Sequence, residues 1–329
     1  MLWLALAFVL AVAIALSWAW SVFKASELDV RGLHVLITGG SDGLGLALAK
    51  QYALKGARVT IVARRQSQLD IAKREILAAA VDTSDASVLA LSADVADAKA
   101  MQDVVAVANE FHGRTVDHIV CNAGITRPDY FVDQDIAVMR RIMDVNYLGV
   151  VHTIKAALPS MITESRISAG RRRRVVIVSS AAALIGFIGY AQYCSSKFAL
   201  RGLAEGLRNE LLLYDIDVSI YFPGNIDTKM LRAELKIKPQ EANDIDGMSV
   251  PATPESAALV LLDGLSRRAF AITNEVAISM LRVLANGIAP RWNTPLELLL
   301  LPILVPIQVV FGLFMDSVVE RAAKKKSSL

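Results

Sequence analysis

A glycine-rich turn between a buried strand pattern and a helical pattern most narrows the folds open to this chain. Residues 33–38 form an apolar, β-branched run, residues 39–45 read Gly-Gly-Ser-Asp-Gly-Leu-Gly, and residues 46–54 have helical periodicity. Glycines in such a turn let backbone amides approach a pyrophosphate, and the following helix directs its positive N-terminus at the same anion. The turn therefore predicts a dinucleotide-binding unit at the start of an α/β domain.

A second chemical signal is the run Tyr-Cys-Ser-Ser-Lys at residues 193–197. Its spacing places Tyr193 and Lys197 on one face of a helix. An ammonium group beside a phenol stabilises the phenolate, so we expect the pKa of Tyr193 to fall below its usual value of about 10. Such a tyrosine can donate a proton to a carbonyl oxygen while a hydride reaches the carbonyl carbon. Alone, the pair also fits a helix surface; with the glycine turn it indicates a redox site.

The rest of the chain alternates between strand and helix patterns. Strands are predicted near residues 33–38, 58–63, 87–92, 116–121, 174–179, 217–222 and 269–273, with helices near 44–55, 66–80, 98–111, 135–162, 192–214 and 254–266. This order predicts an α/β, doubly wound (Rossmann-type) fold with a parallel seven-stranded sheet. Residues 225–253 have weak periodicity and follow a strand, so we expect this segment to cover the substrate at the carboxyl edge of the sheet.

These features together resemble the short-chain dehydrogenase/reductase family over residues 31–275. The family signatures are Thr-Gly-x-x-x-Gly-x-Gly and Tyr-x-x-x-Lys, which residues 38–45 and 193–197 match. Further landmarks of the family are present in order, namely Asn122-Ala123-Gly124, Asn146, Ser180 and Pro223-Gly224. The resemblance implies a catalytic set of Ser180, Tyr193, Lys197 and Asn146.

Each catalytic residue has an expected role. Ser180 would hydrogen-bond the substrate oxygen and stabilise its developing charge; the adjacent Ser179 is a competing choice that the family spacing disfavours. Lys197 would also hold the cofactor ribose, and Asn146 would anchor a water that leads from the lysine to solvent. The resemblance further implies cofactor contacts by Gly39, Ser41, Asp42, Gly43, Leu44, Gly45, Arg64, Asp94, Asn122, Gly124, Tyr193, Lys197, Pro223 and Gly224.

The residues after the second predicted strand favour NADPH as the cofactor. NAD-preferring relatives place an acidic residue there for the ribose 2′-hydroxyl, whereas this chain has Arg64 and Arg65. A guanidinium suits a 2′-phosphate in charge and geometry, and Arg64 is the preferred contact. Asp42, inside the glycine turn, adds an unfavourable charge. Asp94 resembles the acid that meets the adenine ring.

The two ends of the chain are apolar. Residues 2–23 carry no charge and lack the features of a cleaved signal peptide, so we predict a transmembrane anchor over residues 1–24. Residues 298–315 are also uncharged but contain Pro302 and Pro306, which disfavour a straight helix. For the segment 295–316, a re-entrant hairpin, a kinked span and an apolar dimer contact all stay open.

Basic residues follow both apolar segments, with Lys24 and Arg31 after the first and Arg321 and residues 324–326 after the second. Positive charge prefers the cytosolic side of a membrane, so the catalytic domain and a basic tail at 317–329 are predicted to face the cytosol. The basic run at residues 171–174 fits a solvated loop or a contact with anionic lipid head groups.

Within the family, the order of anchor, catalytic domain and apolar segment resembles membrane-bound lipid reductases of the endoplasmic reticulum. This implies NADPH-dependent reduction of a long-chain 3-keto base among membrane lipids, with homo-oligomerisation left open. A retinoid or steroid dehydrogenase, or a non-catalytic NADP(H)-binding sensor or scaffold, remain alternatives. The net charge of +3 gives no support for nucleic acid as a partner, and the four histidines lack metal-ligand spacing. Cys121 and Cys194 are expected to be reduced.

Overall fold

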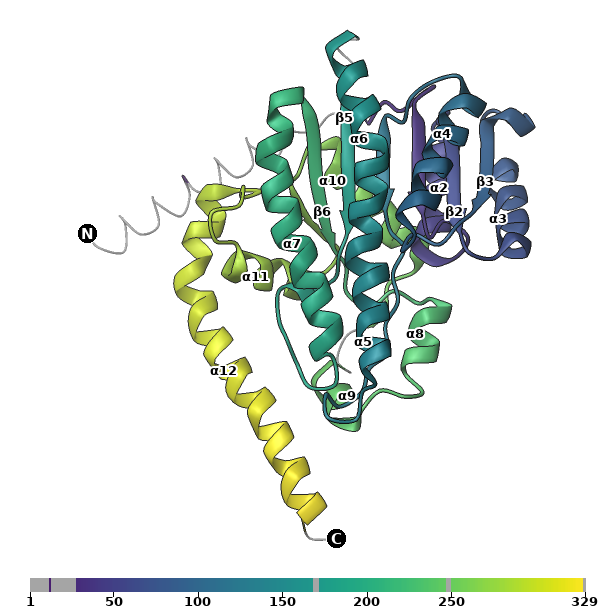
Figure 1. Ribbon diagram of the computed structural model, residues 1–329. Helices are drawn as coiled ribbons and strands as arrows, with labels where there is room; N and C mark the ends of the chain where they lie inside the picture. Colours follow the sequence, from purple (N-terminus) through teal and green to yellow (C-terminus); the bar gives the residue numbers. More distant parts are fainter. Residues whose placement is uncertain (1–11, 13–27, 168–171, 247–249, 328–329) are drawn as a thin grey trace.

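The computed structural model describes residues 12, 28–167, 172–246 and 250–327, so the anchor predicted over residues 1–24 lies outside the described residues, apart from residue 12. A seven-stranded parallel sheet with strand order β3-β2-β1-β4-β5-β6-β7 forms the centre of the molecule (Figure 1). The strands are β1 His34–Thr38, β2 Arg58–Ala63, β3 Val88–Ser92, β4 His118–Cys121, β5 Arg173–Val178, β6 Ile216–Phe222 and β7 Ala271–Thr273. The doubly wound fold predicted from the sequence is confirmed.

Helices cover both faces of the sheet. One face carries α2 Gly43–Leu54, α3 Gln66–Ala79 and α10 Pro254–Ser266, and the other carries α4 Ala98–His112, α6 Gly149–Ile167 and α7 Ala191–Leu211. Neighbouring strand residues alternate between two apolar cores; Ile37 packs in the first and Leu36 in the second. Because both faces are buried, the strands read as continuous apolar runs.

The remaining helices lie near the carboxyl edge of the sheet. The helix predicted over 135–162 is divided into α5 Ile136–Met143, a π-helical turn at Asp144–Leu148, and α6. The predicted loop 225–253 contains two short helices, α8 Lys229–Glu234 and α9 Gln240–Asp246. A further helix, α11 Val276–Ala285, follows β7 and leads toward the C-terminal segment.

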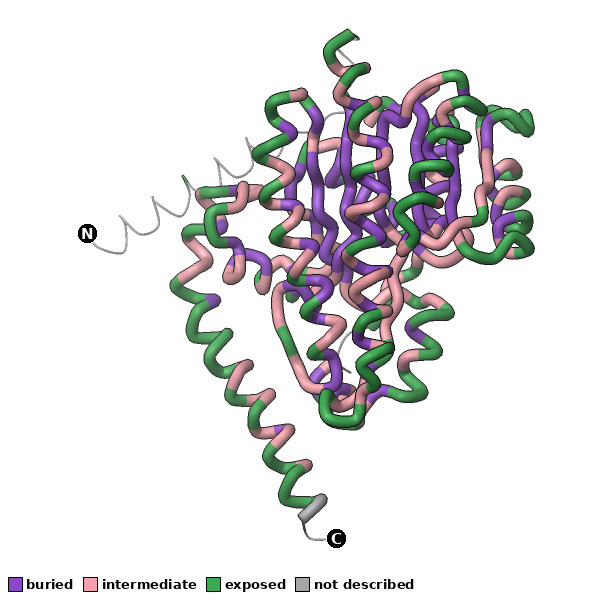
Figure 2. Tube along the Cα trace, in the orientation of Figure 1, coloured by how far each residue is buried: buried purple, intermediate pink, exposed green. Residues whose placement is uncertain are grey.

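The C-terminal segment is one continuous helix, α12 Thr294–Ser327, which contains both Pro302 and Pro306. The expected interruption, and with it the re-entrant hairpin, is therefore wrong, because each proline removes one backbone hydrogen bond while the flanking bonds continue. The predicted tail also belongs to this helix as far as Ser327. Over the part of the chain that the structure describes, α12 is the one helix long and apolar enough to cross a membrane, and most of it is exposed (Figure 2).

Two residues of the basic run at 171–174, Arg173 and Arg174, have a structural role, whereas Arg172 is exposed and residue 171 lies outside the described residues. Arg173 and Arg174 lie in β5 and are 1% and 4% exposed, so the prediction of a solvated loop or a lipid contact is wrong for these two residues. Arg174 pairs with Asp217 of β6 at 3.3 Å, and Arg173 lies 3.9 Å from Asp117. Acids at the amino edge of the neighbouring strands thus neutralise the buried cations.

Candidate active site

Residues that follow β1, β4, β5 and β6 line a cavity of about 1020 Å³ at the carboxyl edge of the sheet. Of the residues predicted from the sequence, this cavity collects Gly39, Asp42, Gly43, Leu44, Arg64, Asn122, Gly124, Ser180, Tyr193, Lys197, Pro223 and Gly224. A smaller cavity beside it is lined by Ser41 and Asp94. Gly45 and Asn146 line neither cavity. Residues from both halves of the chain are therefore brought to one place.

The glycine turn has the backbone that a phosphate cradle needs. Gly39 has φ of +67°, and a Cβ there would lie 2.9 Å from the Cα of Ala123. A Cβ at Gly45 would lie 2.2 Å from the carbonyl oxygen of Gly39. Helix α2 begins at Gly43, and Gly43 and Leu44 in its first turn line the same cavity. The turn thus fits a dinucleotide pyrophosphate, as predicted.

Asp42 is neutralised by a residue that the sequence analysis missed. Its Oδ1 accepts a hydrogen bond from the backbone of Gly43 at 2.8 Å, and its Oδ2 lies 2.9 Å from Nζ of Lys229 on α8. This ion pair joins the glycine turn to the 225–253 segment. Sequence reasoning could not find it, because nothing in the local pattern indicates which loop meets the turn.

The groups expected around the adenosine half lie together. Arg64 is exposed at the end of β2 and, with Arg65, lines both cavities. Asp94 accepts a hydrogen bond from the backbone of Ala96 at 3.0 Å and pairs with Arg141. The two arginines after β2 therefore provide the positive charge at this end of the site.

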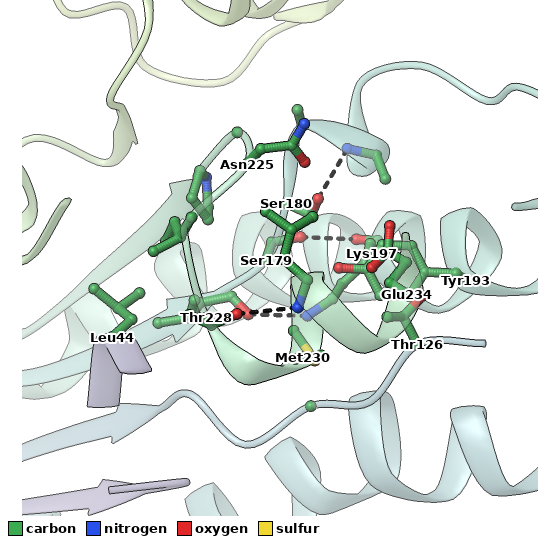
Figure 3. Close-up of a pocket in the computed structure, with 18 of the residues that line it drawn as sticks. Leu44, Thr126, Ser179, Ser180, Tyr193, Lys197, Asn225, Thr228, Met230 and Glu234 are labelled. Atoms are coloured by element: carbon green, nitrogen blue, oxygen red, sulfur yellow. Dashed lines mark hydrogen bonds between the residues drawn. The ribbon is translucent and has the colours of Figure 1, made fainter. Parts of the chain in front are cut away.

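The two adjacent serines have different environments. Ser180 is half-buried, lines the cavity, and hydrogen bonding between it and Tyr193 lowers the pKa of the tyrosine. The Oγ of Ser179 is buried and donates to the backbone carbonyl of Lys197 at 3.2 Å. Figure 3 shows Ser180, Tyr193 and Lys197 around the same space. The geometry favours Ser180 as the residue that meets a substrate oxygen.

Tyr193 and Lys197 lie on one face of α7, with the lysine Nζ 5.7 Å from the centre of the phenol ring. Burial raises the pKa of Tyr193, and the carboxylate of Glu234 raises it further. Burial also lowers the pKa of Lys197 to about 8. The expected lowering of the tyrosine pKa is therefore wrong for the protein alone, because desolvation of the buried phenol is the largest effect on this pKa. A protonated Tyr193 is the state required of a proton donor.

Asn146 lies in the π-helical turn and is fully buried. Its Oδ1 accepts from the backbone amide of Ile125 at 2.8 Å, and its Nδ2 donates to the carbonyl of Ile125 and to Ser196, both at 3.0 Å. Both polar atoms of the Asn146 side chain therefore have hydrogen-bond partners within the protein. A Cβ at Gly124 would lie 3.4 Å from this Oδ1 and 3.6 Å from Nζ of Lys197, so Asn146 and Lys197 both lie next to Gly124.

Several other residues of the cavity were not predicted. Glu234 and Asp246 come from the 225–253 segment, Glu275 and Ile278 from the region after β7, and Phe311 from α12. The acidic side chains carry no periodic pattern in the sequence, and only the folded chain brings them into the same cavity as the catalytic residues. Phe311 shows that the C-terminal helix contributes directly to the site.

Comparisons with known proteins agree with this geometry. Residues 33–238 match the family described as short chain dehydrogenase. The chain is 33% identical over 334 residues to 3-ketodihydrosphingosine reductase of Bos taurus, which covers 100% of this chain and 98% of that protein. It is also 33% identical over 293 residues to the PIGF/3-ketodihydrosphingosine reductase fusion protein of Schizosaccharomyces pombe, covering 89% of this chain but 58% of the fusion. The fold is similar to that in a crystal structure of a short chain dehydrogenase/reductase from Burkholderia phymatum in complex with NAD, with a TM-score of 0.67 and 21% sequence identity. The match covers 78% of this chain and 94% of that chain, and it concerns the fold alone.

Proposed function

This chain belongs to the short chain dehydrogenase family, and we propose that it reduces the 3-keto group of 3-ketodihydrosphingosine to the hydroxyl group of dihydrosphingosine, using NADPH, in sphingolipid synthesis. Relatives named for this activity align over nearly the whole chain. The observation that carries the proposal is the lining of one cavity, which joins Ser180 and Tyr193 to apolar side chains of α11 and α12, among them Leu281 and Phe311. A polar reaction centre continuous with an apolar wall suits a ketone on a long alkyl chain.

The residues divide the chemistry between them. With its pyrophosphate held at the glycine turn, a bound NADPH would supply the hydride for the ketone carbon. Ser180 donates a hydrogen bond to the ketone oxygen, and Tyr193 transfers its proton to that oxygen as the hydroxyl forms. Lys197 positions the ribose and stabilises the phenolate that the transfer leaves. The guanidinium of Arg64 supports NADPH over NADH, because it offers a charge-assisted partner to the 2′-phosphate.

The proposed substrate also implies that the protein works at a membrane. A long-chain base stays in the bilayer, since each buried methylene contributes about 0.8 kcal/mol. Helix α12 packs against both α9 and α11 and reaches the cavity through Phe311. We therefore place α12 in the membrane of the endoplasmic reticulum, with the catalytic domain on the cytosolic side, and the 225–253 segment together with α12 at the entrance for lipid.

NADPH oxidation by the purified full-length chain tests the proposal. 3-Ketodihydrosphingosine, retinal and a 3-ketosteroid are supplied side by side in the same vesicles. Turnover should be fastest with 3-ketodihydrosphingosine. Faster turnover of retinal or the steroid would indicate that the protein catalyses the same reaction on a different substrate. NADPH binding without turnover of any of these substrates would indicate a non-catalytic sensor or scaffold.

A further inference from the structure

The cavity contains a carboxylate that the reduction of a simple ketone does not use. Glu234 is the last residue of α8, is half-buried, and lines the cavity together with Ser180 and Tyr193. Its Oε1 accepts a hydrogen bond from the hydroxyl of Tyr190. Among the residues that the structure describes, its Oε2 has no hydrogen-bond or ion-pair partner. One acceptor oxygen is thus free inside the candidate site.

Glu234 lies close to the proton donor. Figure 3 shows its side chain near Tyr193, and its charge is one of the causes that raise the pKa of Tyr193. The pKa of Glu234 is itself raised, mainly by burial, although the hydrogen bond from Tyr190 and the charge of Lys238 both act to lower it. A further cation next to this carboxylate would offset the remaining cost of burial.

The other charged groups of this region are already engaged or lie elsewhere. Lys238 forms an ion pair with Asp246 at 2.5 Å, and Nζ of Lys197 donates to the carbonyl of Val178 at 3.3 Å. Glu275 also has a buried oxygen without a partner among the described residues. That oxygen lies over Gly224, however, and the causes that shift the pKa of Tyr193 do not include Glu275.

The substrate named above supplies a matching cation. The carbon next to its ketone carries an amino group, which is protonated near neutral pH. A ketone oxygen held by Tyr193 keeps this ammonium group close to the phenol, inside the cavity that Glu234 also lines. A buried ammonium group without a partner would be strongly disfavoured.

We propose that Glu234 binds the ammonium group next to the substrate's ketone and thereby selects amino ketones over ketones that lack the amine. This inference rests on the proposed function and adds a specificity residue to it. The hydrogen bond from Tyr190 then orients the carboxylate, leaving Oε2 for the ammonium group.

The test compares two substrates of equal chain length, 3-ketodihydrosphingosine and its analogue with hydrogen in place of the amino group. Assays run at about pH 6.5, below the usual pKa of an α-amino group. In Glu234→Gln, kcat/KM for the amino ketone should fall by about 10-fold to 150-fold, as expected for loss of a charge-assisted hydrogen bond, and that for the analogue should change little.

Two matched variants serve as controls. Tyr190→Phe removes the hydrogen bond but keeps the carboxylate, and Glu275→Gln removes the neighbouring acid; both should retain the preference for the amino ketone. Equal losses of kcat/KM on both substrates in Glu234→Gln would overturn the proposal. So would loss of the preference for the amino ketone in Glu275→Gln alone, or a loss of that preference in Tyr190→Phe as complete as in Glu234→Gln. Wild-type protein that reduces both substrates equally overturns this inference only, whereas wild-type protein that reduces neither overturns the proposed function with it.

Discussion

Arg282 and Glu297 form a buried ion pair that joins α11 to the first turn of α12, with Nη2 of the arginine 2.5 Å from Oε1 of the glutamate. Their side chains are 7% and 3% exposed. Arg291 adds a second contact to Oε2 at 3.1 Å, and the backbone amide of Trp292 donates to Oε1 at 3.0 Å. This cluster fixes where α12 leaves the catalytic domain, and hence where Phe311 meets the cavity.

Removing the carboxylate should be costly, because it leaves two cations without their partner. Glu297→Ala is expected to lower the free energy of unfolding by about 3–5 kcal/mol, as for other broken buried pairs. Thermal unfolding in detergent measures the loss. Asp103→Asn, which removes the exposed pair with Lys99, is the control and should leave the unfolding temperature unchanged. An equally small effect in both variants would contradict the structural role of Glu297.

Tyr193→Phe tests the proton donor. The substitution removes the phenolic hydroxyl but keeps the ring, so turnover should fall by about 10²-fold to 10⁴-fold while NADPH binding changes no more than a few-fold. Single-turnover kinetics and a fluorescence titration of NADPH give the two values. Retention of more than about a tenth of the wild-type rate would mean that another group supplies the proton.

The charge of Lys197 sets an expected pH dependence. Its pKa is lowered to about 8, so the ammonium group loses its proton as the pH rises through that value, while Tyr193 keeps its own because its pKa is raised. Since kcat/KM for NADPH reports the free enzyme, it should be level at lower pH and decline above about pH 8. NADPH affinity of Tyr193→Phe should decline over the same range, because Lys197 remains. A decline that begins only near the ordinary pKa of lysine would contradict this assignment.

Arg64→Ala tests the choice of cofactor. Loss of a charge-assisted contact to the 2′-phosphate should raise the NADPH Michaelis constant by about 10-fold or more, with a much smaller change for NADH. Arg65→Ala is the matched control, since Arg65 lines the same two cavities. Equal losses for both cofactors in Arg64→Ala would show that this arginine supports the fold and does not recognise the phosphate.

The C-terminal helix should matter for long substrates. Phe311→Ser removes an apolar contact of the cavity and should lower kcat/KM for the long-chain ketone by about fivefold, with little change for a short, soluble keto analogue. Val309→Ser is the control, because Val309 is 59% exposed and does not line the cavity. A truncation after Leu301, which retains Glu297, should show the same difference between substrates. Equal losses on both substrates would mean that α12 only supports the fold.

Much of the molecule follows from local patterns in the sequence. The seven strands and the helices that cover the two faces of the sheet were predicted within a few residues, because burial on both faces of a parallel sheet leaves continuous apolar runs that sequence inspection detects; the short helices α8 and α9 were not predicted. The glycine turn and the pair Tyr193 and Lys197 were also evident, since their function depends on fixed spacing along one strand–turn–helix unit or one helix. These residues line a common cavity, as the family resemblance implies.

Properties that depend on distant parts of the chain were decided by the tertiary structure. Arg173 and Arg174 read as a basic surface run, yet they are buried in the sheet, where acids at the neighbouring strands pair with them. The pKa of Tyr193 is governed by desolvation and by Glu234, neither of which the local spacing reveals. Glu234 reaches the site because the residues after β6 fold back over the carboxyl edge of the sheet. The sequence by itself thus determined the elements and the catalytic motif, while burial, charge partners and the acidic group beside the phenol arose from packing between segments far apart in the chain.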